Sequence, residues 1–168
     1  MDVFDARKRS EIMSRIRSKD TKPERFVRKL LFSAGLRSRI CPASLPGRPD
    51  AALARWRTAV FVNGCFWHSH PGCRFAAKPS QNGEYWTAKL RRNQERDREV
   101  REALLAMGWR VLIVWECACR KRCGEALLER MEAFIREGPD SERRLLEIGR
   151  ADLEAGRGSA TPREPGRN

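Results

Sequence analysis

The sequence predicts an α/β domain in which helices flank a mixed β-sheet. Apolar, β-branched segments at residues 59–62 and 110–115 are typical of buried strands, and they alternate with segments of helical periodicity. This interleaving of strands and helices favours a mixed sheet over an all-helical or all-β fold. With 168 residues, the chain is long enough to bury a core within one domain.

The individual elements follow from local signals along the chain. Thr21 and Glu24 have the spacing of a capping box, and Gly35 can end the helix that they begin. Gly108 likewise ends the longest helical pattern. The expected helices cover residues 22–34, 84–107 and 124–137. The expected strands are short apolar segments at residues 36–40, 51–54, 59–62 and 110–115.

Composition divides the chain into three regions. Residues 1–20 are polar and basic, and we expect a short helix or an arm that becomes ordered only on a partner. Residues 21–138 hold the strands and helices of the expected folded domain. Residues 139–168 are polar, and we expect a frayed helix and a disordered tail.

The net charge indicates a polyanionic partner. Lys and Arg number 35 against 22 Asp and Glu, a formal charge of +13. Nucleic acid is the leading candidate, because Lys and Arg that bind its phosphates release counterions and so favour binding. A basic surface without a nucleic-acid partner is the alternative. No apolar run approaches the roughly 20 residues that span a bilayer, and the N-terminus lacks the apolar core of a secretory signal. We therefore expect a cytoplasmic protein with no membrane partner.

The segment VNGCFWHSHPGC, residues 62–73, carries both histidines of the chain and two of its six cysteines. In a reducing compartment such a cluster favours metal ligands over disulfides. Zinc takes four Cys or His ligands, and Cys117 or Cys119 could supply one from the end of another predicted strand. One histidine is then spare, and His68 and His70 would face opposite ways in an extended segment. Reduced cysteines packed in loops are the alternative.

A carboxylate and three aromatic residues are further candidate functional residues. Asp50 follows a proline at the start of a predicted strand, which is where restriction-type nucleases place a metal-binding aspartate. The next strand of those nucleases carries a second carboxylate and a lysine, and residues 62–64 here have neither. Mg²⁺ could use Asp50, a backbone carbonyl and phosphate oxygens. Phe66, Trp67 and Trp86 suit stacking on or wedging between bases, although each alone is more often a core residue. Five arginines of the long helix could line a phosphate track or a solvated face: Arg91, Arg92, Arg96, Arg98 and Arg101.

Four segments together resemble the very-short-patch-repair (Vsr) DNA mismatch endonucleases. They are ASLPGRPD (43–50), NGCFWHSHPGC (63–73), EYWTAKLRRNQERDRE (84–99) and GWRVLIVWECA (108–118). The resemblance implies that residues 21–138 form an endonuclease domain, with a restriction-endonuclease-like core, a structural Zn²⁺ and a catalytic Mg²⁺, and that residues 1–20 are an arm that grips DNA. It implies nicking of one strand of double-stranded DNA at T:G mismatches left by deamination of 5-methylcytosine. It also implies a monomer at the nucleoid, linked in function to a DNA cytosine methyltransferase and a repair polymerase.

The resemblance also assigns roles to individual residues. The family's catalytic positions match Asp50, His68, Glu24 and Asp97, with Glu24 and Asp97 near metal-bound waters. The Mg²⁺ ligands match Asp50 and the backbone carbonyl of Val62. The zinc positions match Cys65, His70, Cys73 and Cys117. The DNA wedge matches Phe66, Trp67 and Trp86, and the N-terminal arm matches Met13.

Two departures from the family pattern leave questions open. Asn63 stands where some members have a second active-site histidine. An apparent insertion at residues 71–72 leaves the zinc ligands open among His68, His70 and Cys73. The rival functions are a zinc-stabilised DNA-binding module without catalysis and a restriction-type nuclease that ignores mismatches.

Overall fold

The computed structural model describes residues 19–77 and 82–155. It holds a four-stranded sheet in the order β1-β2-β3-β4. Strand β1 pairs antiparallel with β2, and the other two pairings are parallel, so the predicted mixed sheet is confirmed. The strands are β1 (Ala51–Leu53), β2 (Thr58–Asn63), β3 (Arg110–Trp115) and β4 (Leu145–Ile148).

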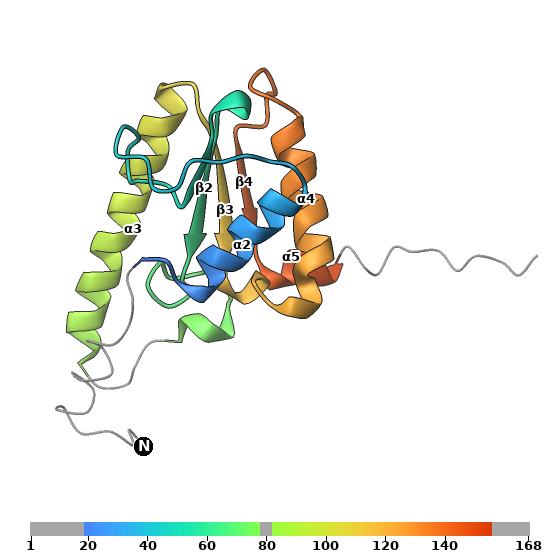
Figure 1. Ribbon diagram of the computed structural model, residues 1–168. Helices are drawn as coiled ribbons and strands as arrows, with labels where there is room; N and C mark the ends of the chain where they lie inside the picture. Colours follow the sequence, from blue (N-terminus) through green and yellow to red (C-terminus); the bar gives the residue numbers. More distant parts are fainter. Residues whose placement is uncertain (1–18, 78–81, 156–168) are drawn as a thin grey trace, which may run out of the picture.

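Helices cover both faces of this sheet. Figure 1 shows α2 and α4 packed on one face and the long α3 on the other. The helices are α2 (Lys22–Ser33), α3 (Gly83–Ala106), α4 (Gly124–Arg136) and the short α5 (Arg150–Ala155). Thr21 caps α2 as predicted, since its Oγ1 accepts a hydrogen bond from the backbone N–H of Glu24 at 3.4 Å. None of the helices in the described ranges is both long and apolar enough to cross a bilayer.

The core has two layers because side chains of a strand alternate between the faces of the sheet. In β3, Leu112 and Val114 pack with the apolar sides of α2 and α4. Val111 and Ile113 point the other way and pack with Leu104 of α3. Both faces of β3 are therefore buried, as its continuous apolar sequence predicts.

A buried arginine joins three elements at the start of β3. The guanidinium of Arg110 is fully buried and bonds to Glu137 (2.8 Å), to the carbonyl of Phe134 (2.6 Å) and to the carbonyl of Arg143 (3.0 Å). Burial lowers the pKa of Arg110, and the charge of Glu137 opposes that shift. Arg110 thus fastens the end of α4 and the segment leading into β4 to the centre of the sheet.

Two expectations differ from the structure. Residues 36–40 form no strand; Arg39 makes a single bridge to Ala52. Residues 145–155, expected to be a frayed helix and disordered tail, form β4 and α5 and extend the domain past residue 138. Ile148 and Leu153 are buried in the core, which stabilises this segment. The predicted arm at residues 1–20 with Met13, except its last two residues, and residues 156–168 lie outside the described residues.

Candidate active site and metal centre

The site lies at the carboxyl ends of β2 and β3, the two central strands of the sheet. Because these strands are parallel and Val62 pairs with Val114, the chain leaves both strands at the same edge. The loop beginning at Gly64 follows β2, and the single helical turn η3 (Glu116–Ala118) follows β3. Residues separated by about fifty positions in sequence therefore meet here, below the arrowheads in Figure 1.

A tight turn, rather than an extended segment, separates the two histidines. The backbone N–H of His68 bonds to the carbonyl of Gly64 at 3.1 Å, and that of His70 bonds to the carbonyl of Cys65 at 2.9 Å. Between the histidines, Ser69 adopts a left-handed conformation with φ of 51°, which is uncommon for a residue with a Cβ. The predicted divergence of His68 and His70 is thus present, but the turn at Ser69 produces it.

His70 belongs to a cluster of four residues that could hold a metal ion. The ligand atoms of Cys65, His70, Cys73 and Cys117 all lie within 4.8 Å of one another. The sulfurs of Cys65 and Cys117 are each 3.5 Å from Nδ1 of His70. Ligands of a tetrahedral zinc ion with Zn–S and Zn–N bonds of usual length stand about 3.6 Å apart. The four donors fit such an ion.

The ionisation of the cluster is consistent with that fit. Burial raises the pKa of the Cys65 and Cys117 thiols, so two adjacent thiolates need a cation beside them. Burial lowers the pKa of His70, which keeps its ring neutral and able to bind a metal. The ring also stacks on Trp115, with centroids 4.1 Å apart and planes at 6°.

Cys119, the alternative ligand considered from the sequence, is not part of this cluster. Its sulfur lies 3.8 Å from the carbonyl oxygen of Trp115, a backbone contact away from the other ligands. Burial raises the pKa of Cys119 to about 12, and it raises the pKa of Cys65 and of Cys117 as well, so position rather than ionisation separates the two candidates. The geometry therefore favours Cys117 over Cys119.

Asp50 lies beside the end of β2 in a partly buried position. Its Oδ2 accepts a hydrogen bond of 2.7 Å from the backbone N–H of Val62. Burial raises the pKa of Asp50 from 3.8 to about 6; the Val62 bond opposes this shift, and the charge of Glu24 adds to it. His68 lowers the same pKa, so Glu24 and His68 both lie within electrostatic reach of Asp50.

Glu24 approaches this carboxylate from the first turn of α2. The residue is 6% exposed, its Oε1 accepts a 2.8 Å hydrogen bond from Thr21, and its Oε2 lies 3.6 Å from Arg28. A buried carboxylate whose pKa is raised by a second carboxylate nearby is typical of sites for divalent cations. Asp50 and Glu24 therefore form a second candidate metal site, made of oxygen ligands that suit Mg²⁺.

His68 faces α3 and pairs with Asp97. The distance from Nδ1 of His68 to Oδ2 of Asp97 is 2.6 Å, and both side chains remain about one-third exposed. A carboxylate at Nδ1 requires a proton on that nitrogen, which leaves Nε2 with its lone pair when the ring is neutral. One helical turn earlier, Asn93 donates a 3.0 Å hydrogen bond to the carbonyl of Trp67 and holds the loop against α3.

The three predicted wedge residues form one aromatic cluster beside this pair. Phe66 lies 5.1 Å from Trp67 and 5.3 Å from Trp86, measured between ring centroids, in edge-to-face arrangements. Tyr85 joins the cluster at 5.3 Å from Trp86 and is 58% exposed. The amine of Lys89 lies 5.3–5.6 Å from the rings of Trp67, Tyr85 and Trp86.

Comparisons with known proteins show which family the chain is similar to. A family model described as DNA mismatch endonuclease Vsr matches residues 1–74. The DNA mismatch endonuclease Vsr of Escherichia coli (strain K12) is 45% identical over 137 residues, which cover 80% of this chain and 87% of that protein. This chain belongs to the Vsr family. The type II nicking enzyme V.XorIIP of Xanthomonas oryzae pv. oryzae is 44% identical over 116 residues (69% of this chain, 85% of that enzyme). The type II nicking enzyme V.NmeAIP of Neisseria meningitidis serogroup A is 39% identical over 140 residues (83% and 98%).

Within this Vsr-family chain, Tyr85 is the aromatic residue that the sequence reasoning missed. We expected it on the buried side of the long helix, but it lies five positions, about 140° around the helix axis, from the buried Leu90. It is exposed because the first turn of α3 extends beyond the sheet, as Figure 1 shows. Its position next to Trp86 in sequence was the available signal.

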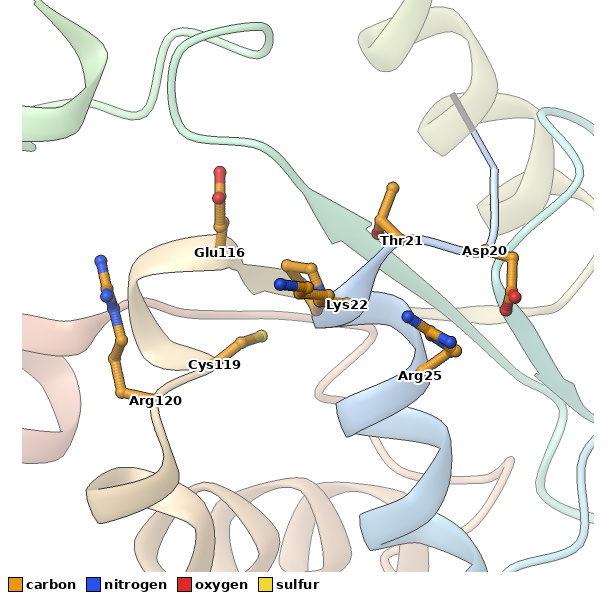
Figure 2. Close-up of a pocket in the computed structure, with 8 residues that line it drawn as sticks. Asp20, Thr21, Lys22, Arg25, Glu116, Cys119 and Arg120 are labelled. Carbon is orange, nitrogen blue, oxygen red and sulfur yellow. The ribbon is translucent and has the colours of Figure 1, made fainter. Parts of the chain in front are cut away.

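A groove borders the same site on the side of α2. It has a volume of about 680 Å³ and runs between the first turn of α2 and the segment after β3. Figure 2 shows Lys22 and Arg25 coming from α2, and Glu116, Cys119 and Arg120 coming from η3 and the following residues. A Cβ on Gly64 would lie 3.6 Å from Oε2 of Glu116, so the groove adjoins the histidine-bearing loop. No local pattern in the sequence indicates this groove.

Proposed function

We propose that this chain is a Mg²⁺-dependent endonuclease that nicks one strand of duplex DNA at T:G mismatches. The observation that carries the proposal is the placement of Asp50 and the His68–Asp97 pair at one sheet edge, beside a partly exposed aromatic cluster. Acidic ligands, a proton acceptor and base-stacking side chains are the parts that mismatch-dependent phosphodiester hydrolysis needs. Such mismatches arise when 5-methylcytosine deaminates, so a DNA cytosine methyltransferase and a repair polymerase are the expected functional partners.

The Mg²⁺ site would consist of Asp50, the backbone carbonyl of Val62 and water held by Glu24. These oxygen donors fit a hard cation, and a cation would relieve the repulsion between Asp50 and Glu24. When bound, Mg²⁺ offsets charge on the scissile phosphate and lowers the pKa of bound water. The carboxylate of Glu24 is already oriented to hold a metal-bound water, because Thr21 and Arg28 contact it.

His68 would transfer a proton through Nε2, and Asp97 would orient its ring. The 2.6 Å contact puts Asp97 on the far nitrogen of the imidazole, so Asp97 holds the tautomer and stabilises the ring once it is protonated. We therefore revise the expected role of Asp97 from holding metal-bound waters to positioning His68. Asn63 is 92% buried next to the site, and the proposed chemistry needs no second histidine there.

Phe66, Trp67 and Trp86, together with Tyr85, would enter the base stack at the mismatch. A mismatched pair costs less to unstack than a matched one, so deformability contributes to the choice of site. The cluster rests on α3 and on the loop that Asn93 holds in place, which makes it a preformed wedge. The predicted contribution of Met13 from the N-terminal arm stays a prediction, since Met13 lies outside the described residues.

Phosphate contacts would come from cations that lack acidic partners. Arg91, Arg98 and Arg101 of α3 lie 3.6–3.9 Å from glutamates, which compensates their charges. Within the described part of the chain, no acidic side chain forms an ion pair with Arg92 or Arg96. These two arginines, one helical turn apart, are thus the phosphate ligands that α3 offers.

The groove supplies a second basic surface on the other side of the site. Lys22, Arg25 and Arg120 line it, and no acidic side chain among the described residues forms an ion pair with them. Asp20 and Glu116 also line the groove, so three cations face two carboxylates. A backbone phosphate next to the cleaved bond would contact the cations, since the described lining residues include no aromatic side chain on which a base could stack.

The four-residue cluster would hold a structural Zn²⁺. Three sulfurs and one imidazole nitrogen are soft and borderline donors that suit zinc, and four protein ligands close a tetrahedral site. Such an ion would fasten the loop after β2 to η3 and so fix His68 relative to Asp50. A central mixed sheet with the acidic site at a strand end supports the proposed restriction-endonuclease-like core.

Duplex oligonucleotides with and without one T:G pair test the proposal. Incubation with Mg²⁺ should give one nick in the mismatched duplex, and EDTA should abolish it. Asp50→Ala should remove the nick, while Arg91→Ala, which changes a compensated charge, should keep it. A nick that persists in Asp50→Ala would exclude the proposed site, and equal cleavage of matched duplex would exclude mismatch dependence.

A further inference from the structure

The junction between β4 and α5 packs against the proposed zinc ligand His70. Gly149 at this junction is buried, and a Cβ there would lie 2.8 Å from Cε1 and 3.0 Å from Nε2 of the His70 ring. A side chain at position 149 therefore requires the ring to move. The N–H of Gly149 donates a 2.7 Å hydrogen bond to Asp152, which holds the backbone in this close approach.

The next residue contacts a second ligand. The backbone N–H of Arg150 points at the sulfur of Cys117, with a nitrogen–sulfur distance of 3.3 Å. A hydrogen bond to a ligand sulfur favours the thiolate and fixes its direction. The side chain of Arg150 is not involved, because it pairs with Glu154 on the surface.

The face of the His70 ring is held by the same part of the sheet. Trp115 stacks on this face, and its indole N–H donates a 3.2 Å hydrogen bond to Glu147 of β4. The ring is thus fixed on its face by Trp115 and at its Cε1–Nε2 edge by Gly149. Both restraints depend on β4 lying beside β3.

We propose that the Gly149–Arg150 junction positions His70 and Cys117, so that metal retention depends on the docked β4–α5 segment. The buried side chains of Ile148 and Leu153 anchor this segment in the core. By linkage, metal binding then stabilises the docked segment as much as the segment stabilises metal binding. The inference rests on the proposed zinc centre and is independent of DNA cleavage.

A pair of glycine variants tests the approach to His70. Gly149→Ala adds a methyl group against the ring, whereas Gly83→Ala adds one where no atom lies within 4 Å. Zinc release is measured by competition with a chromogenic chelator on the purified full-length protein. We expect Gly149→Ala to bind zinc about 10- to 100-fold more weakly, as is usual when a residue supporting a metal ligand is lost, and Gly83→Ala to match the wild type.

A second pair isolates the amide that contacts Cys117. Arg150 is the first residue of α5, where proline is tolerated, so Arg150→Pro deletes the N–H with little cost to the helix. Arg150→Ala keeps the N–H and deletes only the side chain. We expect Arg150→Pro to weaken zinc binding and to shift the sulfur–cobalt absorption band of the Co²⁺-substituted protein, and Arg150→Ala to leave both unchanged.

The outcomes separate the inference from the zinc centre itself. A wild-type protein without zinc, about one ion per chain being expected, would refute the proposed centre. Wild-type zinc affinity in both Gly149→Ala and Arg150→Pro would refute the positioning role, as would equal losses in the two control variants. If Gly149→Ala does not fold even in excess zinc, the Arg150 pair decides the question.

Discussion

Replacing Asp50 with asparagine should stabilise the protein while it abolishes cleavage. The carboxyl of Asp50 has its pKa raised from 3.8 to about 6, chiefly by burial. The folded state therefore holds this proton more tightly than the unfolded state, and the contribution of Asp50 to stability falls as the pH rises from about 4 to about 6. Above pH 6 the folded protein carries a partly buried charge that Asp50→Asn removes.

The magnitude follows from the shift. A change from 3.8 to about 6 corresponds to about 3 kcal/mol in the free energy of unfolding. The asparagine keeps the shape of the side chain, and its Oδ1 can still accept the bond from the N–H of Val62. We therefore expect Asp50→Asn to raise the free energy of unfolding by about 2–3 kcal/mol at pH 8, and by almost nothing at pH 3.5.

Urea unfolding at pH 3.5, 5, 6.5 and 8, without divalent cations, measures this difference. Asp140→Asn is the matched control, because the same change at an exposed carboxylate should stay within about 0.5 kcal/mol at every pH. Added Mg²⁺ should stabilise the wild type and not Asp50→Asn. A variant that is equally or less stable than the wild type at pH 8 would show that Asp50 is not under electrostatic strain.

Three further predictions concern α3 and the core. Arg92→Ala should lower the slope of log binding constant against log salt by about 0.9, while Arg91→Ala, whose charge is compensated, should leave it unchanged in a fluorescence binding assay. Asp97→Asn should reduce the single-turnover nicking rate by about 10²–10⁴-fold with mismatch binding intact, and an unchanged rate would refute its positioning role. Arg110→Ala should destabilise the protein by about 3–5 kcal/mol in urea unfolding, because it leaves a cavity and unpaired buried carbonyls; a loss below 1 kcal/mol would contradict this.

Strong local signals explain why most of the fold was predictable. The cap at Thr21 and the continuous apolar run of β3 determined a helix start and a buried strand, and both are where the sequence places them. Strand β4 was missed because it lies at the edge of the sheet, where its burial pattern does not alternate cleanly. Its pairing with β3 depends on contacts with residues more than thirty positions away, which no local pattern reports.

The metal-binding part of the candidate site was predictable, because zinc binds mainly Cys and His and these residues cluster in the sequence. Four soft ligands and a spare histidine pointed to separate tasks for His70 and His68, and the structure brings the ligands together. The turn that separates the two tasks was not predictable, because serine rarely adopts the left-handed conformation found at Ser69. The pairing of His68 with Asp97 likewise depends on how α3 packs against the loop.

Helix α3 links base insertion and proton transfer mechanically. Trp86 of the aromatic cluster and Asp97, the partner of His68, stand on the same unbroken helix, about 16 Å apart along its axis. A helix of this kind moves as a rod, so a displacement of its aromatic end on entering DNA also moves Asp97. Discrimination between mismatched and matched duplex would then appear in the turnover rate as well as in the binding affinity. Insertion of the aromatic cluster at the mismatch would both recognise the site and bring Asp97 and His68 into position for cleavage.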